Sequence, residues 1–465
     1  LWFFGIHGGN VMDYVPLHIF GAQADGAVIT KTFVDHFAFM GGCGTTLCLI
    51  LACLLTARRR KQRQIAWTSA PFALFNINEI VIFGFPVFLN PYLLLPFLLV
   101  PLCTLLLSYG AAQIGLLPPV ASEVTWTIPA LFSGYAATGS FWGSAVQLFN
   151  IGVGTLLYIP FVRLYERQAE RQERVQLARL TELLRRSQEN QEERALLERN
   201  DNLGETARAV AGALVRDIQR GEIPVNYQPQ VDAEGRTAGG EALLRWQYQG
   251  MAVAPPLAVA LSKEAGYYDA LTNVVLEQAC AQAAGFIGRA PQFIVSVNIT
   301  VEQLMDGGFV DRVLELVARY GLDGHLGLEI TEETSAAYLE RSMEGLRRLR
   351  AHDVKILLDD FGMGYTSLRY LQSRTFDCVK LDGSIVREIC RNERCREIVA
   401  SVIQLGQTLE MQIVAEYVET EEVRNELRRM GCNFYQGYLY GPAVPAEVFA
   451  ERFLPRGGSN AGADF

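Results

Sequence analysis

The sequence predicts two structural classes in one chain: an α-helical membrane domain, followed by an α/β barrel of the TIM-like (β/α)8 type. Two observations predict the membrane domain. Between Arg63 and Arg163 the only charged residues are Glu79 and Glu123, and apolar stretches in this region are long enough to cross a bilayer. A third observation predicts the barrel. From Gly212 onward, eight short apolar runs alternate with segments of helical spacing over about 240 residues.

Composition excludes several classes of protein. The 465 residues are 50% hydrophobic and 20% charged, and nearly all the charge follows the apolar region, which excludes a plain cytosolic enzyme. The formal net charge of −9 argues against binding a nucleic-acid polymer through bulk electrostatics. The nine cysteines lack CxxC spacing, so neither a disulfide framework nor a zinc site is indicated.

Three apolar stretches are predicted to cross the membrane: residues 37–57, residues 92–117, which contain Pro96 and Pro101, and residues 128–162. Basic clusters follow the first and third stretches and mark the cytoplasmic side, so the C-terminal barrel is expected in the cytoplasm. The predicted location is therefore a bacterial inner (cell) membrane, crossed more than once.

Residues 71–90 are predicted to form a re-entrant segment of broken helices, because their polar residues would be unfavourable facing lipid. Glu79 is the candidate functional residue here, since an ionisable group at membrane depth usually has a function. The alternative is a structural role in which Asn76 or Asn78 satisfies the Glu79 carboxylate. His7 alone is a weak signal.

Three motifs resemble the lactose/cellobiose-type C component of bacterial phosphotransferase sugar permeases: FFGIHGGN at 3–10, GGCGTTL at 41–47, and NINE at 76–79 running on to Asn90-Pro91. The resemblance covers about residues 1–165 and corresponds to only the later half of a family member. It implies that His7 and Glu79 contact a sugar, with a β-linked disaccharide as the expected ligand. Ile80 stands where the family usually has Pro. A sensing or anchoring domain is expected rather than a transporter, and a sugar permease with an appended regulatory domain is an alternative.

Residues 166–204 are predicted to form a helical linker, because Arg, Glu, Gln and Leu dominate this segment. Leu177, Leu180 and Leu184 form a short seam with coiled-coil spacing. The periodicity is compatible both with a solvated stalk and with a signalling helix that relays movement or dimerises. Residues 205–455 are assigned to the barrel and residues 456–465 to a disordered tail.

Polar residues gather at the carboxyl ends of the predicted strands, where barrel active sites are built. Glu241 is expected at the start of its run, and six others lie within a residue or two of a strand's carboxyl end: Asn298, Glu329, Asp359, Asp360, Lys380 and Glu416. Converging carboxylates would repel one another unless cations neutralise them, and oxygen ligands without His or Cys select Mg²⁺ or Mn²⁺. Two adjacent aspartates can serve two ions, which indicates in-line phosphoryl displacement. Any one of these residues alone would more often be a helix cap or a salt-bridge partner.

The same residues lie in motifs that resemble the EAL family of cyclic di-GMP phosphodiesterases. These are GGEALLRW at 239–246, NIT at 298–300, EITE at 329–332, DDFGMGY at 359–365, VKLD at 379–382, AEYVE at 415–419 and QGY at 436–438. The resemblance implies a barrel whose first strand is antiparallel to the others. It also implies that the protein hydrolyses cyclic di-GMP to linear pGpG with two Mg²⁺ or Mn²⁺ ions, and that it forms a homodimer.

The resemblance also implies roles for individual residues. The expected metal ligands are Glu241, Asn298, Glu329, Asp359 and Asp360. The expected catalytic residues are Glu241 together with Lys380 and Glu416, which would orient and activate the attacking water. Substrate would be held by Gln228, Arg245, Asp382 and Gln436, with Gln436 also supporting the water end of the site. Glu332 would anchor the Asp360–Ser367 loop.

Three positions depart from the family pattern. Met363 and Thr366 stand where the loop usually has Thr and Ser, and Tyr417 replaces a usual Gly beside Glu416. No expected ligand is missing. The departures leave a second hypothesis open, in which the barrel is a receptor that binds cyclic di-GMP without hydrolysing it.

Overall fold

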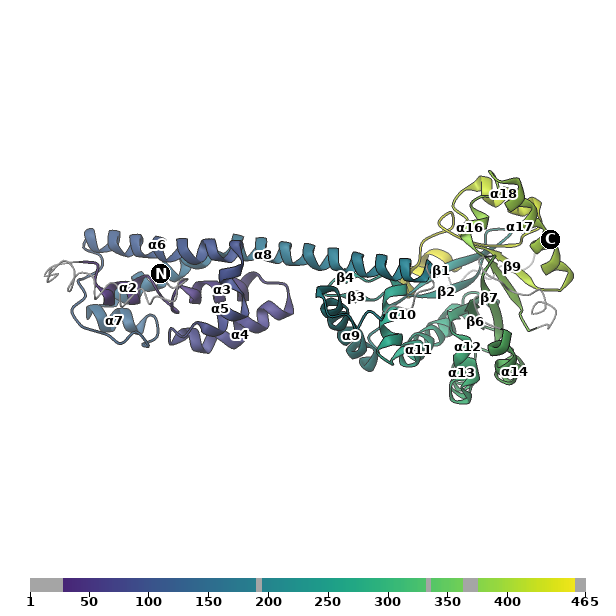
Figure 1. Ribbon diagram of the computed structural model, residues 1–465, viewed down its shortest axis with the longest axis horizontal. Coiled ribbons are helices and arrows are strands. Elements are labelled where there is room, and N and C mark those ends of the chain that lie inside the picture. Colours follow the sequence, from purple (N-terminus) through teal and green to yellow (C-terminus); the bar gives the residue numbers. More distant parts are fainter. Residues whose placement is uncertain (1–27, 190–194, 332–335, 363–374, 456–465) are drawn as a thin grey trace. The chain divides into compact units, whose positions relative to one another are not determined.

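The computed structural model describes residues 28–189, 195–331, 336–362 and 375–455 (Figure 1). The chain divides into two compact units, Leu1–Val175 and Gln176–Phe465. The division falls inside the segment predicted as a linker. Each unit has its own buried apolar core.

The first unit is all-helical. Its elements are α2 (Lys31–Phe37), α3 (Thr46–Thr56), α4 (Arg60–Leu74), α5 (Glu79–Gly84), the 3-10 helix η2 (Val87–Leu89), α6 (Pro91–Gln113), α7 (Phe132–Thr138) and α8 (Phe141–Glu189), the last of which extends into the second unit. Among the described residues, α6 and the Phe141–Ser187 part of α8 are long and apolar enough to cross a bilayer. The helix α6 covers most of the second predicted span, residues 92–117, and continues through both of its prolines; its crossing of a membrane stays a prediction.

The prediction of one span over residues 37–57 is wrong. The apolar helix α3 covers only Thr46–Thr56, and residues 38–45 form a loop. Gly41, Gly42 and Gly44 all have positive φ values, which cannot continue a right-handed helix. At Gly42 a Cβ atom would lie 2.7 Å from the backbone oxygen of Asn76, so the close approach of two segments requires glycine there.

The third predicted span begins later than expected. Residues 128–131 are not helical, α7 occupies Phe132–Thr138, and the long helix starts at Phe141. Gly139, with a φ of 62°, ends α7 in the left-handed conformation and separates the two helices. Residues 71–90 do form short, broken helices, with a non-helical stretch between Leu74 and Glu79. A re-entrant path for them stays a prediction.

The predicted linker is helical only in part. The helix α8 runs without interruption to Glu189, residues 195–201 are not helical, and α9 (Asn202–Arg220) begins the barrel unit. Leu177 and Leu180 are 6% and 0% exposed and belong to the core of the barrel unit. The leucine face is therefore neither a solvated surface nor free to form a seam with another copy.

We expect Leu180→Ala to destabilise the barrel unit by about 2–5 kcal/mol, because truncating a fully buried leucine removes apolar contacts and leaves a cavity. Hydrogen exchange of the barrel strands in the full chain would measure the change. Val175→Ala is the matched control, since Val175 lies on the same helix and is 49% exposed; its effect should stay within about 0.5 kcal/mol. Equal protection in the two variants would show that α8 does not stabilise the barrel.

Eight strands close the barrel, in the order β10-β9-β8-β7-β6-β5-β2-β1, with β1 pairing back to β10. Their bounds are β1 Val225–Asp232, β2 Thr237–Leu244, β5 Ile294–Asn298, β6 Leu326–Thr331, β7 Lys355–Phe361, β8 Cys378–Leu381, β9 Gln412–Ala415 and β10 Phe434–Gln436. The strand β1 is antiparallel to both of its barrel neighbours, and the other pairs are parallel. The predicted barrel, with its one antiparallel strand, is confirmed.

Helices surround the strands of this unit (Figure 1). They are α10 (Pro255–Glu264), α11 (Tyr268–Ile287), α12 (Val301–Met305), α13 (Gly307–Tyr320), α14 (Ala336–Ala351), α16 (Gly383–Val386), α17 (Glu393–Thr408), α18 (Glu421–Arg429) and α19 (Ala446–Phe453). Two short hairpin strands, β3 (Gln247–Tyr248) and β4 (Met251–Ala252), follow β2, and β11 (Val444–Pro445) pairs with β1. Strand residues such as Val295, Leu328 and Ile356 are fully buried. Because successive strand residues point to opposite faces, the residues between them fill the barrel interior.

Candidate active site

Lys380 is the centre of the charged cluster inside the barrel. It lies on β8, its side chain is 1% exposed, and its ammonium contacts four carboxylates. Lys380 Nζ is 2.6 Å from Glu329 Oε2, 2.7 Å from Glu416 Oε1, 3.1 Å from Asp359 Oδ1 and 3.2 Å from Glu241 Oε2. These acids come from β2, β6 and β7 and from the residue after β9, so closure of the barrel brings five segments together.

Glu241 lies deeper than the sequence predicted. It is within β2, which begins at Thr237, and not at the start of a strand. The sequence missed this because Gly239 and Gly240 do not look like strand residues. Asn298 Nδ2 donates to Glu241 Oε1 at 2.8 Å, and Gln436 Nε2 donates to Glu241 Oε2 at 2.6 Å. These two hydrogen bonds hold the carboxylate toward Lys380.

The pKa values show that the cluster lacks positive charge. Burial alone would lower the pKa of Lys380, but the charges of Glu241 and Glu329 raise it well above its ordinary value. Burial and the charge of Glu241 raise the pKa of Glu329 far above its usual range. The pKa of Glu241 itself is lowered, because Lys380 and the two amide donors outweigh the effect of burial. One ammonium therefore does not neutralise the buried acids.

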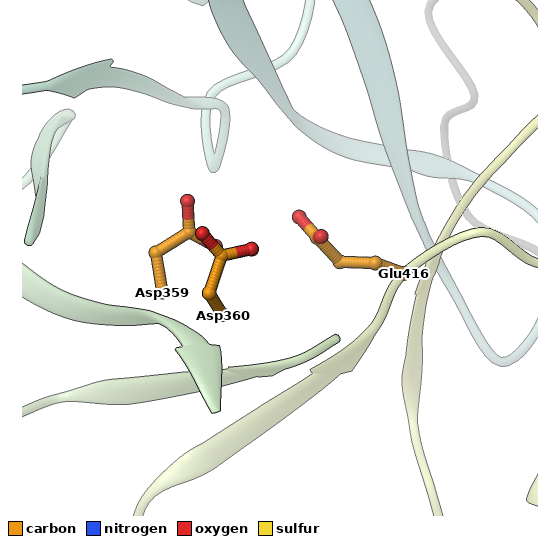
Figure 2. Close-up of side chains that lie close together, drawn as sticks. All are labelled: Asp359, Asp360 and Glu416. Atoms are coloured by element: carbon orange, nitrogen blue, oxygen red, sulfur yellow. The ribbon is translucent and has the colours of Figure 1, made fainter. Parts of the chain in front are cut away.

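Asp359, Asp360 and Glu416 form the opening of this cluster. Figure 2 shows the two aspartate carboxyls directed toward the carboxyl of Glu416. One ligand oxygen from each lies within 4.8 Å of the others, close enough to share a cation. Burial, partly offset by Lys380, raises the pKa of Glu416 to about 8, and burial with the charge of Asp359 raises that of Asp360 to about 6.

The donor set fits a hard divalent cation. Within the described residues, Glu329 Oε1 is buried and accepts no hydrogen bond, and the buried Asp359 Oδ1 has only its contact with Lys380, an ammonium shared with three other carboxylates. Buried carboxylate oxygens of this kind are unfavourable unless a proton or a cation satisfies them. The three side chains close enough to share a cation, Asp359, Asp360 and Glu416, offer carboxylate oxygens, which Mg²⁺ and Mn²⁺ prefer. The sequence-predicted ligands Glu241, Asn298, Glu329, Asp359 and Asp360 are thus brought to one place.

Of the predicted substrate residues, Gln436 and Gln228 are linked to this cluster by hydrogen bonds, and Asp382 is near enough for its charge to act on Asp360. Gln228 is opposite Glu241 in the β1–β2 register, and its Oε1 accepts from Gln436 Nε2 at 3.5 Å. Arg245 follows β2 and is half-buried, with Nη1 donating to the carbonyl of Leu244 at 2.8 Å. Asp382 follows β8 and accepts from the backbone N–H of Ser384 at 2.7 Å.

Gln230 is a site residue that the sequence reasoning missed. Its side chain is buried, and Nε2 donates to Gln436 Oε1 at 2.9 Å, which orients the Gln436 amide toward Glu241. A signal was available, because Gln228 and Gln230 are two residues apart on one strand and therefore face the same side.

Some candidate residues lie outside the described residues or apart from the acidic cluster. Glu332, Met363, Thr366 and His7 lie outside the described residues. Glu79 begins α5 and is exposed. The alternative in which Asn76 or Asn78 satisfies Glu79 gains no support: Asn76 Oδ1 accepts from the Gly41 backbone N–H, and Asn78 Nδ2 donates to the Cys43 carbonyl.

Comparisons with known proteins match both units. A family model described as "EAL domain" matches residues 211–443, half of the chain. A model described as "Phosphotransferase system, EIIC" matches residues 1–101. The two matches agree with the resemblances that the motifs carry.

Similar curated proteins match the barrel half. The bifunctional diguanylate cyclase/cyclic di-GMP phosphodiesterase MucR of Pseudomonas aeruginosa is 36% identical over 234 residues, which cover 50% of this chain and 34% of that protein. A signalling protein of Caulobacter vibrioides is 39% identical over 242 residues, 50% of this chain and 30% of that protein. The chain thus spans about a third of the length of these relatives.

Two further matches cover more of the compared protein. A Mycobacterium bovis protein, Mb1392c, is 34% identical over 243 residues, which are 50% of this chain and 79% of that protein. Among solved structures, the EAL enzyme Bd1971 in its cGMP-bound form matches with a TM-score of 0.50 and 25% identity, covering 59% of this chain and 75% of that one.

Proposed function

We propose, from the premise that this chain belongs to the EAL domain family, that its barrel is a cyclic di-GMP phosphodiesterase. The reaction would hydrolyse one phosphodiester bond and release linear pGpG. The observation that carries the proposal is the buried set of carboxylates around Lys380, which keeps every expected ligand in one place. The activity in the printed name of MucR, 36% identical over the barrel, supports the same substrate.

The charges support a site for two divalent cations. Glu241, Glu329, Asp359, Asp360 and Glu416 carry five negative charges when ionised, and Lys380 returns one positive charge. The remaining four negative charges equal the charge of two divalent ions. We assign Asp359, Asp360 and Glu416 to the open side and Glu241, Asn298 and Glu329 to the deeper side. When bound, Mg²⁺ or Mn²⁺ supplies Lewis-acid stabilisation of the phosphoryl oxygens and lowers the pKa of water.

The chain's own residues would position and deprotonate the attacking water. Glu416 lies at the opening and is the proton acceptor of the proposal, while Lys380 holds its carboxylate at 2.7 Å. Attack of the water oxygen on phosphorus forms one P–O bond and breaks the bond to a ribose 3′-oxygen. That oxygen takes up a proton, so water is added across the bond and linear pGpG is the product. Gln228, Arg245, Asp382 and Gln436 would hold the substrate.

The test is hydrolysis by the full chain, purified in detergent and incubated with cyclic di-GMP. We expect linear pGpG with Mg²⁺ or Mn²⁺, and none in a chelating buffer. Addition of either ion to the chelated protein should restore turnover. Binding of cyclic di-GMP without any product would favour the receptor hypothesis, and neither binding nor product would reject both.

For the first unit we propose an inner-membrane domain that crosses the bilayer more than once and leaves the barrel in the cytoplasm. The match to the phosphotransferase EIIC model and the apolar helices α6 and α8 support it. The basic residues after residue 57 and after residue 162 support the orientation. The chain would contact membrane lipid through this domain and form a homodimer, as the family resemblance implies.

We also propose that a β-linked disaccharide near His7 and Glu79 regulates the barrel. The helix α8 continues from the first unit into the second without a break after Pro160, so it can transmit movement. A ligand acts in this way only if it favours one arrangement of the helices.

Inserting two glycines after Val175, between the two units and before α8 enters the barrel core at Leu177, is expected to abolish regulation by disaccharide while leaving basal hydrolysis intact. Each glycine costs about 1 kcal/mol in a helix and frees the backbone, so a rigid relay should fail there. Hydrolysis rates in membranes, with and without a panel of β-linked disaccharides, would measure this; a two-alanine insertion is the control that keeps the helix. If no sugar changes the rate of the unaltered chain, the sensing proposal is rejected.

A further inference from the structure

Tyr417 has an unusual backbone conformation beside the candidate active site. It directly follows Glu416 and has a φ of 51°, a left-handed value that is rare for a bulky side chain. Such conformations persist where the surrounding structure enforces them and are found most often at functional sites. The side chain nevertheless remains 46% exposed. Its conformation therefore places an aromatic ring at the rim of the barrel opening instead of burying it.

The Tyr417 ring supports the guanidinium of Arg387. Arg387 Cζ lies over the ring, 4.4 Å from its centroid. The ring also lies against Gly383, where a Cβ atom would be 2.2 Å from Tyr417 Cδ2. Gly383 and Arg387 are four residues apart and share one face of the short helix α16. Tyr417 thus packs along this face and determines where Arg387 lies.

The guanidinium of Arg387 is available to a ligand. Arg387 is exposed, and in the part of the chain that the structure describes its guanidinium has no hydrogen-bond or ion-pair partner beyond the Tyr417 ring. A guanidinium stacked on an aromatic ring keeps its N–H donors free in its own plane. The pair therefore presents a forked set of donors at the rim of the site.

The surroundings of the pair are acidic. Besides burial, the charges of Glu416, Asp382 and Asp360 raise the pKa of Tyr417, and Arg387 lowers it. The cations of the proposed function would offset the charges of Glu416 and Asp360 for a phosphate, whereas a neutral nucleobase needs no such compensation. A guanine presents two neighbouring acceptors, O6 and N7, that match the fork of an arginine.

We propose that Arg387, held in place by Tyr417, is a specificity-determining residue that reads the O6 and N7 edge of a guanine base in the substrate. The inference rests on the proposed function, because it presumes that a cyclic dinucleotide occupies the opening beside Glu416. Tyr417 is a positioning residue in this arrangement. Its place in the sequence is one where the family resemblance leads us to expect glycine.

Equilibrium binding to the full chain in detergent micelles tests the proposal, in chelating buffer so that no turnover occurs. The probes are cyclic di-GMP and cyclic di-AMP, which have the same phosphates, while adenine presents a donor in place of the O6 acceptor. The unaltered chain is expected to prefer cyclic di-GMP by about 10-fold or more, the effect of one bidentate base contact. Arg387→Ala should remove most of that preference.

Three further variants separate the guanidinium fork of Arg387 from its charge, from the Tyr417 hydroxyl and from a neighbouring exposed arginine. Arg387→Lys keeps the charge but lacks the fork, so it should resemble Arg387→Ala. Tyr417→Phe keeps the ring and should bind like the unaltered chain. Arg391→Ala removes an exposed charge from the turn after α16 and should keep the full preference.

The proposal is overturned if Arg387→Ala keeps the preference for cyclic di-GMP, or if it weakens both dinucleotides equally, which would indicate a phosphate contact. If the unaltered chain binds cyclic di-GMP but forms no pGpG with Mg²⁺, only the proposed hydrolysis is rejected. The comparison of Arg387→Ala with the unaltered chain in binding the two dinucleotides would still test the role of Arg387. An unaltered chain that binds neither dinucleotide in chelating buffer and forms no pGpG with Mg²⁺ would reject both.

Discussion

Replacing Glu241 with alanine is expected to lower kcat for cyclic di-GMP hydrolysis by about 1000-fold or more, equivalent to about 4 kcal/mol of transition-state stabilisation. Glu241 receives hydrogen bonds from Asn298 and Gln436 and contacts Lys380 at 3.2 Å. Its removal would take a ligand from the deeper cation position and release the amides that orient it. Steady-state kinetics of the full chain with Mg²⁺ would measure the loss.

Glu234→Ala is the matched control for this variant. Glu234 lies in the turn between β1 and β2, where its carboxylate is 60% exposed and pairs with Arg236. Removing it deletes the same charge from a neighbouring position, and kcat should stay within about twofold, since exposed ion pairs contribute little. A kcat for Glu241→Ala close to that of the control would contradict the role assigned to Glu241.

Replacing Lys380 with methionine is expected to destabilise the barrel by about 3–5 kcal/mol in a chelating buffer, because it leaves four buried carboxylates without their shared cation. Millimolar Mg²⁺ should restore part of the stability, since divalent ions neutralise the same carboxylates. Hydrolysis of cyclic di-GMP should not be restored together with stability, because the Lys380→Met variant lacks the ammonium that holds Glu416. Hydrogen exchange of the barrel strands and hydrolysis assays would follow the two effects separately.

Lys355→Met serves as the control. Lys355 lies on β7, is 32% exposed and pairs with Asp353, so its loss should change stability by about 1 kcal/mol or less, with no dependence on Mg²⁺. If chelated Lys380→Met were as stable as this control, the carboxylates would not depend on the ammonium for neutralisation.

The sequence predicted the barrel well because its strands are short apolar runs separated by helical spacing. The eight apolar runs predicted from Gly212 onward agree in number with the eight strands that close the barrel. The prediction was weakest where local pattern and packing disagree. Two glycines concealed the first half of β2, and three glycines divided an apolar stretch that looked like one membrane span.

By itself the sequence determined the helical membrane part, the α/β barrel and the identity of the acids that meet at its opening, because strand periodicity and motif spacing are local properties of the chain. Only the tertiary structure decided that Lys380 joins four carboxylates, that Gln230 orients Gln436, and that Leu177 and Leu180 of α8 are buried in the barrel core. It also placed Arg387 over the ring of Tyr417. These contacts join residues far apart in the chain, and their geometry depends on the register and closure of the barrel, which no local pattern specifies.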